Sequence, residues 1–286
     1  MKSEFDHIVN YYKKKGNPRN IYYDLFKEFF NRLKKYINAK LFHFKRAQTF
    51  TKNRYERIWN KTKIVNWYDP NFDLGLHVFD KELFFASAGI TKKIHHQLII
   101  KEIEIFKPKK VLEVGSGNGI NLRILSSLFK DINFYGIDQS ENGIKISNQL
   151  KNEKLIPELV KPFNYNFDFE NLPTNLVYSL GDAKALNFRE NEIDFVYTIL
   201  ALEQMDDIKL KVLKELKRVA KKKIVLIEPF PELNRGVIKY LHHRSKQYFN
   251  LNHKSIIDQN WTIEKFITNV PTKVSLGYGM LVLVKN

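Results

Sequence analysis

A glycine-rich turn is the part of this 286-residue sequence whose residue types point most directly to chemistry. Residues 113–119 read Glu-Val-Gly-Ser-Gly-Asn-Gly and overlap the end of a predicted strand at 110–114. Glycines at a strand-to-helix turn let the backbone approach a ligand closely, at the edge where open α/β sheets bind ligands. The spacing differs from the G-x-G-x-x-G of dinucleotide-binding turns, because position 120 is Ile120.

A carboxylate ends the next predicted strand. Asp138 lies 23 residues beyond Gly115. At the tip of the second strand, a carboxylate can accept hydrogen bonds from both hydroxyls of a ribose. No Lys or Arg that would suit a diphosphate stands near the turn. Together, the turn and the carboxylate predict a site for a nucleoside without a diphosphate.

The elements that must position these residues follow an alternating pattern after Pro108. Apolar strand patterns alternate with helical spacings of three and four, which is typical of a parallel sheet with helices on both faces. The last two strands have no helix between them, so we expect an antiparallel pair. The predicted strands are 110–114, 132–137, one ending near 180, 193–199, 223–227, 261–267 and 280–285, with helices at 91–106, 120–129, 142–150 and 208–220.

The N-terminal part has a different sequence pattern. A short helix is expected before Gly16, and residues 20–48, which contain no Pro or Gly, predict one amphipathic helix. Residues 66–90 carry turn signals and are interpreted as a connecting loop. We therefore divide the chain into a helical, basic extension at 1–90 and a main domain at 91–286.

The net charge of +17 lies mostly in this extension. Residues 1–63 hold 17 Lys and Arg against five Asp and Glu, a net charge of +12. A nucleic-acid surface, a membrane-surface helix and a compositional habit of the chain are all open explanations.

Other classes of protein are excluded by composition. The chain has no Cys, which rules out disulfides, thiolate metal sites and Cys nucleophiles. No His, Asp and Glu spacing resembles a metal site, so we predict no metal. No signal segment or membrane-spanning stretch is seen. We expect a cytoplasmic protein, with peripheral membrane contact through residues 20–48 as one option.

The order of the motifs resembles that of class I S-adenosylmethionine-dependent methyltransferases of the type 11 kind. The glycine turn and Asp138 are followed by Gly181-Asp182-Ala183 and then Leu186-Asn187-Phe188, which is similar to the family's G-D-A-x-x-L-P-F stretch. Residues 202–204, Leu-Glu-Gln, resemble a Leu-Glu-His segment, with Gln204 in place of the usual His. The usual Pro-Gly-Gly turn before the fifth strand is here three lysines, 221–223. The resemblance implies a Rossmann-like α/β fold and S-adenosyl-L-methionine as cofactor.

It also implies residue roles. Glu113 would hold the amine of the donor's methionyl end, directly or through water, and Asp182 the adenine amine. The full implied cofactor-binding set is Glu113, Gly115, Ser116, Gly117, Gly119, Asp138, Gln139, Asp182, Ala183, Thr198 and Ile199.

Methyl transfer from a sulfonium requires alignment and, for a hydroxyl or protonated amine acceptor, a general base. His242 and His243, beyond the fifth strand, are the first candidates, with His253 beside them. His95 and His96 are second choices, and Glu228, which ends the fifth strand at the same edge of the sheet, is a further option for facing the acceptor. Residues 161–169 alternate aromatic and polar side chains, which fits either a lid strand or an edge hairpin.

Three functions remain open from the sequence. The leading one is methyl transfer to a small-molecule or lipid-linked acceptor, by analogy with family members whose N-terminal helices cap the donor. RNA methylation is less favoured, because the basic residues alternate with apolar ones in an amphipathic helix. A non-catalytic S-adenosylmethionine-binding protein is the third.

Overall fold

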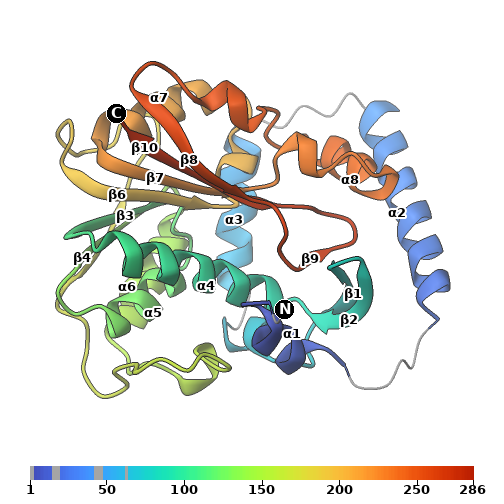
Figure 1. Ribbon diagram of the computed structural model, residues 1–286, viewed down its shortest axis with the longest axis horizontal. Coiled ribbons are helices and arrows are strands. Elements are labelled where there is room, and N and C mark those ends of the chain that lie inside the picture. The colour runs from blue at the N-terminus through green and yellow to red at the C-terminus, as the bar shows by residue number, and fades with distance from the viewer. Residues whose placement is uncertain (1–2, 15–19, 42–47, 62–63) are drawn as a thin grey trace.

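A seven-stranded sheet forms the centre of the computed structural model, which describes residues 3–14, 20–41, 48–61 and 64–286 (Figure 1). The strand order is β5-β4-β3-β6-β7-β10-β8. The first five pair in parallel, whereas β10 runs antiparallel to both β7 and β8. This confirms the predicted fold class and the antiparallel C-terminal pair. The strands are β3 (Lys110–Val114), β4 (Asn133–Asp138), β5 (Leu176–Leu180), β6 (Ile193–Ile199), β7 (Ala220–Glu228), β8 (Trp261–Ile267) and β10 (Gly279–Lys285).

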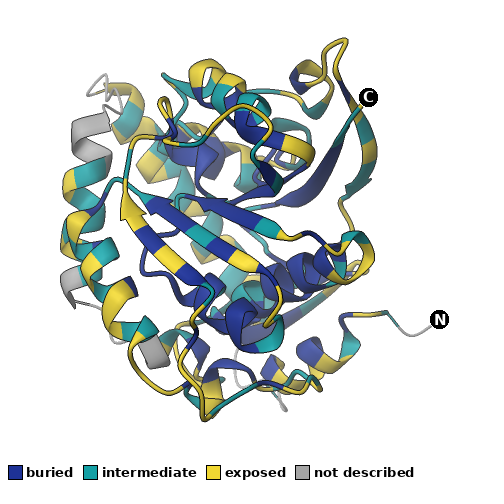
Figure 2. Cartoon of the chain, turned by 90° about the vertical axis from the view of Figure 1, so that its left-hand side faces the viewer, coloured by how far each residue is buried: buried dark blue, intermediate teal, exposed yellow. Residues whose placement is uncertain are grey.

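Helices cover both faces of the sheet because its strands are apolar on both sides. In β6, Phe195 and Tyr197 pack in one core with Ile94 of α4, while Val196 packs in the other with Leu216 of α7. The central strands are buried along most of their length (Figure 2). The helices that connect these strands or precede the first of them are α4 (Gly89–Phe106), α5 (Ile120–Leu128), α6 (Glu141–Lys151) and α7 (Lys209–Val219).

The N-terminal extension contributes three helices, α1 (Asp6–Tyr12), α2 (Ile21–Leu41) and α3 (Gln48–Lys61). The first two confirm the short helix and most of the long one. The predicted long helix extended over residues 42–47, which lie outside the described residues. α2 packs against α8 (Val237–Lys246), a helix that was not predicted from the sequence.

The prediction of a connecting loop at 66–90 is wrong. After the short η1 helix (Ile64–Tyr68), β1 (Leu74–Phe79) and β2 (Glu82–Ser87) form a hairpin, and β9 (Thr272–Lys273) pairs with β1. The two turn residues, Asp80 and Lys81, both have positive φ, 47° and 69°. Two-residue hairpin turns of this kind usually contain Gly, and its absence here removed the expected sequence signal.

The aromatic segment at 161–169 contains neither a lid strand nor an edge hairpin. Phe163 and Phe167 instead pack with Tyr68 and Leu159 in a third, smaller cluster. Single-turn helices complete the chain: η2 (Pro157–Leu159), η3 (Leu202–Gln204), η4 (Pro231–Leu233) and η5 (His253–Ile256). In the described part of the chain, every helix is too short or too polar to cross a lipid bilayer.

Candidate active site

The glycine turn between β3 and α5 adopts a backbone that other residues rarely take. Gly115, Gly117 and Gly119 have φ values of 83°, 55° and 75°, where an L side chain is strained. Space is also short, since a Cβ at Gly115 would lie 2.5 Å from Cβ of Ala201. The amides of Gly115 and Ser116 donate to the carbonyl of Ile137, at 2.8 and 3.0 Å, and tie the turn to β4. The predicted role of glycine therefore has a steric basis.

Asp138 ends β4 beside this turn. Its Oδ2 accepts the amide of Gly117 at 2.8 Å, and its Oδ1 accepts the amide of Ser140 at 2.8 Å. Burial raises the pKa of Asp138, and these backbone hydrogen bonds act in the opposite direction. A carboxylate has about four lone-pair sites, so acceptor capacity remains for a ligand.

A cavity of about 350 Å³ lies at the carboxyl ends of β3, β4 and β6. Its wall contains eight of the eleven residues predicted for the cofactor, namely Gly115, Ser116, Gly117, Asp138, Gln139, Asp182, Ala183 and Ile199. Motifs that are separate in the sequence therefore lie together on one surface, because parallel strands end at the same edge of the sheet.

The other three predicted residues do not line the cavity. Glu113 is buried and its Oε1 accepts the side-chain amide of Asn121 at 2.6 Å. Burial raises the pKa of Glu113 to about 8, although the Asn121 hydrogen bond and the charge of Lys92 lower it. Thr198 donates its hydroxyl to Glu228, and Gly119 caps the start of α5.

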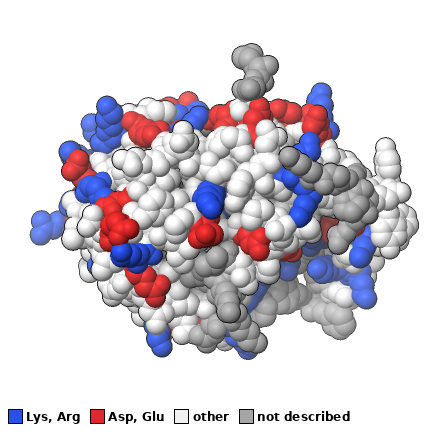
Figure 3. All heavy atoms as spheres, turned by 90° about the horizontal axis from the view of Figure 1, so that it is seen from below, with Lys and Arg blue, Asp and Glu red and all other residues white. Residues whose placement is uncertain are grey.

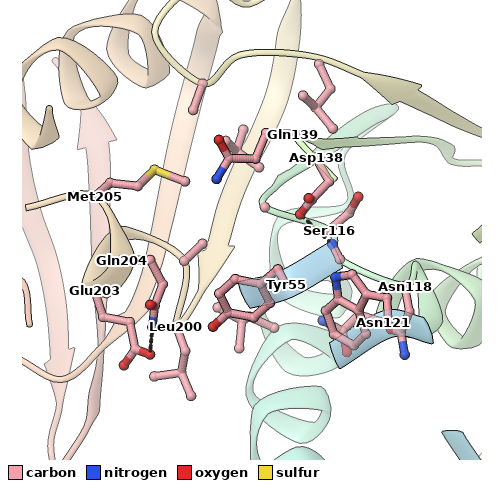
Figure 4. A pocket seen from close by; sticks show the side chains of 18 of the residues that line it. Tyr55, Ser116, Asn118, Asn121, Asp138, Gln139, Leu200, Glu203, Gln204 and Met205 are labelled. Atoms are coloured by element: carbon pink, nitrogen blue, oxygen red, sulfur yellow. Dashed lines mark hydrogen bonds between the residues drawn. The ribbon is translucent and has the colours of Figure 1, made fainter. Parts of the chain in front are cut away.

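Helix α3 covers the cavity, which the sequence did not reveal. Tyr55, Ile58 and Trp59 of α3 line the wall. Figure 4 shows Tyr55 projecting between Asp138 on one side and Gln204 on the other. The available signal was the spacing of Tyr55 and Trp59, four residues apart on one helix face, but spacing does not say what that face covers.

A carboxylate of α3 fixes this cover to the main domain. Glu56 accepts the backbone amides of Glu141 and Asn142, at 2.8 and 3.0 Å, at the first turn of α6. A negative side chain there satisfies free amides and interacts favourably with the helix dipole. These hydrogen bonds therefore hold α3, the helix that covers the cavity, against the first turn of α6.

Among the described residues, four that line the cavity carry buried polar atoms without a hydrogen-bond partner. They are the Ser116 hydroxyl, the Asn118 side-chain nitrogen, the Trp59 indole nitrogen and both ring nitrogens of His95. Buried polar groups are normally paired. A polar ligand in this cavity would supply the missing partners.

Residues 112–227 match a family model described as a methyltransferase domain. These residues form an S-adenosylmethionine-dependent methyltransferase domain. The match extends from β3 to β7 and so includes the glycine turn, Asp138 and Asp182. No curated protein matches the chain in sequence.

Solved structures similar to this chain are distant in sequence. The [4+2]-cyclase SpnF is 14% identical with a TM-score of 0.52, over 70% of this chain and 82% of that one. A magnesium protoporphyrin IX methyltransferase from Synechocystis PCC 6803 with bound SAM is 16% identical with a TM-score of 0.49, over 88% and 97%. A SAM dependent methyltransferase from Aquifex aeolicus is 19% identical with a TM-score of 0.46, over 66% and 89%. The likeness to SpnF shows a shared fold.

Among the residues that the structure describes, His95 is the histidine that lines the cavity of the methyltransferase domain. It is buried, its ring meets Tyr278 edge-on with centroids 4.6 Å apart, and neither ring nitrogen has a hydrogen-bond partner among the described residues. Burial and the nearby charge of Lys92 hold the pKa of His95 well below its ordinary value. Its imidazole is therefore held in the neutral form.

The first-choice histidines lie elsewhere. His242 and His243 are on α8, and neither lines the cavity. The Nε2 of His243 lies 3.1 Å from the carbonyl of Pro229, while burial and the charges of Arg32 and Lys246 lower the pKa of His242 to about 3. Both are buried.

The remaining candidates also have other partners. The ring of His253 stacks on Phe266, and its Nδ1 bonds the carboxylate of Glu232. His96 lies 2.8 Å from the side-chain oxygen of Asn121 and so supports the Glu113 contact.

Glu228 does not line the cavity, contrary to the expectation that it faces the acceptor. It accepts the Thr198 hydroxyl and the amides of Ala201, Leu202 and Glu203 at 2.9–3.1 Å. Glu228 thus shapes the loop after β6, which forms one side of the cavity. Within the described ranges, no group of His, Asp and Glu side chains is arranged to hold a metal ion.

Proposed function

We propose that this methyltransferase domain acts on a small-molecule or lipid-linked acceptor that enters the cavity beneath α3. The observation that carries the proposal is the packing of α3 over the glycine turn. Because α3 closes this side, the reacting methyl group would be reached through a cavity of about 350 Å³. Cavities of roughly 300–1,000 Å³ are typical of small-molecule sites.

The residues present fit S-adenosylmethionine. Asp138 would accept the ribose hydroxyls, Asp182 and Ala183 would lie at the adenine, and Glu113 with Asn121 would support the methionyl amine. The unpaired indole nitrogen of Trp59 offers a further donor. When bound, the donor supplies an electrophilic methyl group next to a thioether leaving group, so alignment of the acceptor is the main task left to the protein.

On the acceptor side, we assign the general base to His95 in place of His242 and His243. His95 lines a cavity whose wall also contains Lys92 and Glu203, and neither of its ring nitrogens has a hydrogen-bond partner among the described residues. A neutral imidazole can remove a proton from a hydroxyl or an ammonium as the methyl group is transferred. Lys92, whose ammonium lies 5.1 Å above the ring of Trp67, adds positive charge that favours an acidic acceptor group.

RNA methylation has less support from the structure. On the face drawn in Figure 3, the basic and acidic side chains of the described residues are interspersed and do not form a continuous basic surface. A polynucleotide substrate usually meets such a surface.

The test is incubation of the full chain with isotopically labelled donor and a cell extract, followed by separation into small-molecule, lipid and RNA fractions. We expect the label in the small-molecule or lipid fraction, and none with the Asp138→Ala variant. Label in RNA would overturn the acceptor class. Donor binding without any labelled product would favour the non-catalytic interpretation.

A further inference from the structure

The outer face of α2 carries a continuous apolar stripe. None of the residues of α2 is buried, and its large apolar side chains are spaced mainly by three, four and seven, which places them on one side of the helix. The exposed members, hereafter the α2 stripe, are Tyr22 (82%), Tyr23 (64%), Phe26 (62%), Phe30 (48%), Ile37 (45%) and Leu41 (68%).

The opposite side of α2 attaches the helix to the protein. Tyr36 approaches Tyr240 of α8 with ring centroids 6.4 Å apart. The guanidinium of Arg32 binds Glu28 and also lies 3.3 Å from the Ser275 hydroxyl. Figure 1 shows α2 on the outer side of α8, at the edge of the molecule. The α2 stripe is therefore not needed for attachment, and contiguous exposed apolar surface of this kind commonly marks an interaction site.

The charges around the α2 stripe are mostly positive. Helices α2 and α8 together contain eight Lys and Arg against two acids, Asp24 and Glu28. Both acids are only partly exposed, and Glu28 is paired with Arg32. The exposed basic residues of α2 are Lys27, Lys34, Lys35 and Lys40.

We propose that the α2 stripe docks on an anionic lipid surface. An apolar face with aromatic side chains, bordered by lysines, is the arrangement of a helix that lies in the plane of a membrane interface. The apolar side chains would enter the boundary between headgroups and acyl chains, and the lysines would meet the anionic headgroups. This docking does not depend on which acceptor is methylated.

Other occupants fit the α2 stripe less well. Two copies of the chain meeting here would bring two positively charged surfaces together, which like-charge repulsion opposes. RNA would match the lysines, but Ile37 and Leu41 give no flat ring on which a base could stack. The combination of aliphatic and aromatic side chains with a positive border favours lipid.

The test is sedimentation of the full chain with vesicles of phosphatidylcholine alone or mixed with phosphatidylglycerol. We expect binding to the mixed vesicles that weakens as salt increases. The Phe26→Ser/Phe30→Ser variant should bind at least about tenfold more weakly, because two large apolar side chains no longer enter the interface. The Lys34→Gln/Lys35→Gln variant should lose most of the preference for anionic vesicles.

Matched controls use equally exposed residues elsewhere. Leu210 of α7 is 67% exposed, and Lys221 and Lys222 are exposed at the start of β7. Leu210→Ser and Lys221→Gln/Lys222→Gln should leave vesicle binding unchanged.

The docking proposal would be overturned by no binding to mixed vesicles, by equal loss in the controls, or by a dimer in solution that the Phe26→Ser/Phe30→Ser variant dissociates. RNA binding that the same variant abolishes would also count against it. Donor affinity measured by calorimetry on the same samples separates these results from a failure of the proposed methyl transfer.

Discussion

Trp59 of α3 packs on the glycine turn so closely that a Cβ at Gly117 would lie 2.7 Å from its Cζ2 atom. One wall of the candidate donor site is therefore supplied by the N-terminal extension, far outside the residues that match the methyltransferase family model. The extension and the domain have to be folded together for this cavity to exist.

This contact predicts a strong effect of Gly117→Ala. The new methyl group would collide with Trp59, and the φ of 55° disfavours a side chain. We expect donor affinity, measured by calorimetry, to fall at least about tenfold, which corresponds to about 1.4 kcal/mol. Gly75→Ala is the matched control, because its Cβ would meet open space. Equal behaviour of the two variants would contradict the close packing.

Two carboxylates, Asp138 at the end of β4 and Asp182 just beyond β5, predict a second result. Asp138→Asn keeps the shape of the side chain but removes the charge that would accept the ribose hydroxyls. Hydrogen bonds to charged groups are worth about 1.5–3 kcal/mol, so donor affinity should fall roughly 10- to 100-fold. Asp182→Asn should weaken binding less, because Asp182 is more exposed and already pairs with Lys184. Glu170→Gln, an exposed carboxylate outside the cavity, should have no effect, and unchanged affinity in Asp138→Asn would refute the assignment.

The raised pKa of Glu113 predicts a dependence of stability on pH. An unfolded Glu has a pKa near 4.5 and folded Glu113 one of about 8, so the folded state binds the proton more tightly. Its contribution to stability is fully present below about pH 4.5 and is lost as pH rises through 8, by about 1.4 kcal/mol for each pH unit between the two values.

Glu113→Gln, which cannot ionise, isolates this effect. Without donor, the free energy of unfolding of the variant should increase relative to the unmodified protein as pH rises from 5 to 8. The difference between the proteins is the useful quantity, because Lys93, with a pKa lowered to about 6, changes stability in the opposite direction in both. Denaturant titrations over this pH range provide the measurement. A difference in the free energy of unfolding that stays constant with pH would show that the pKa of Glu113 is not raised.

The position of His95 predicts which histidine matters for transfer. His95→Gln should reduce the rate of label transfer about 100-fold or more, as expected for a general base, while donor affinity stays within twofold or so. His243→Gln is the comparison, because His243 lies outside the cavity wall and binds a backbone carbonyl. The His243→Gln variant should transfer label at the same rate as the unmodified protein. The reverse pattern would return the assignment to α8.

Several features followed from the sequence because they depend on neighbouring residues. The glycine turn was predictable because positive φ is a local requirement, and Asp138 because it directly ends an apolar strand. The alternation of strands and helices gave the parallel sheet, since apolar residues such as Phe195 and Val196 must face opposite cores.

The features that were missed depend on contacts between distant parts of the chain. The β1–β2 hairpin escaped prediction because Asp80 and Lys81 adopt positive φ without a glycine. Only the folded chain places Trp59 on Gly117, turns Glu228 away from the cavity and brings His95, rather than His242 or His243, to its wall. A residue type and its local spacing indicate which chemistry is available. Which copy of that residue performs it is decided by packing, where side chains far apart in sequence compete for the same buried space.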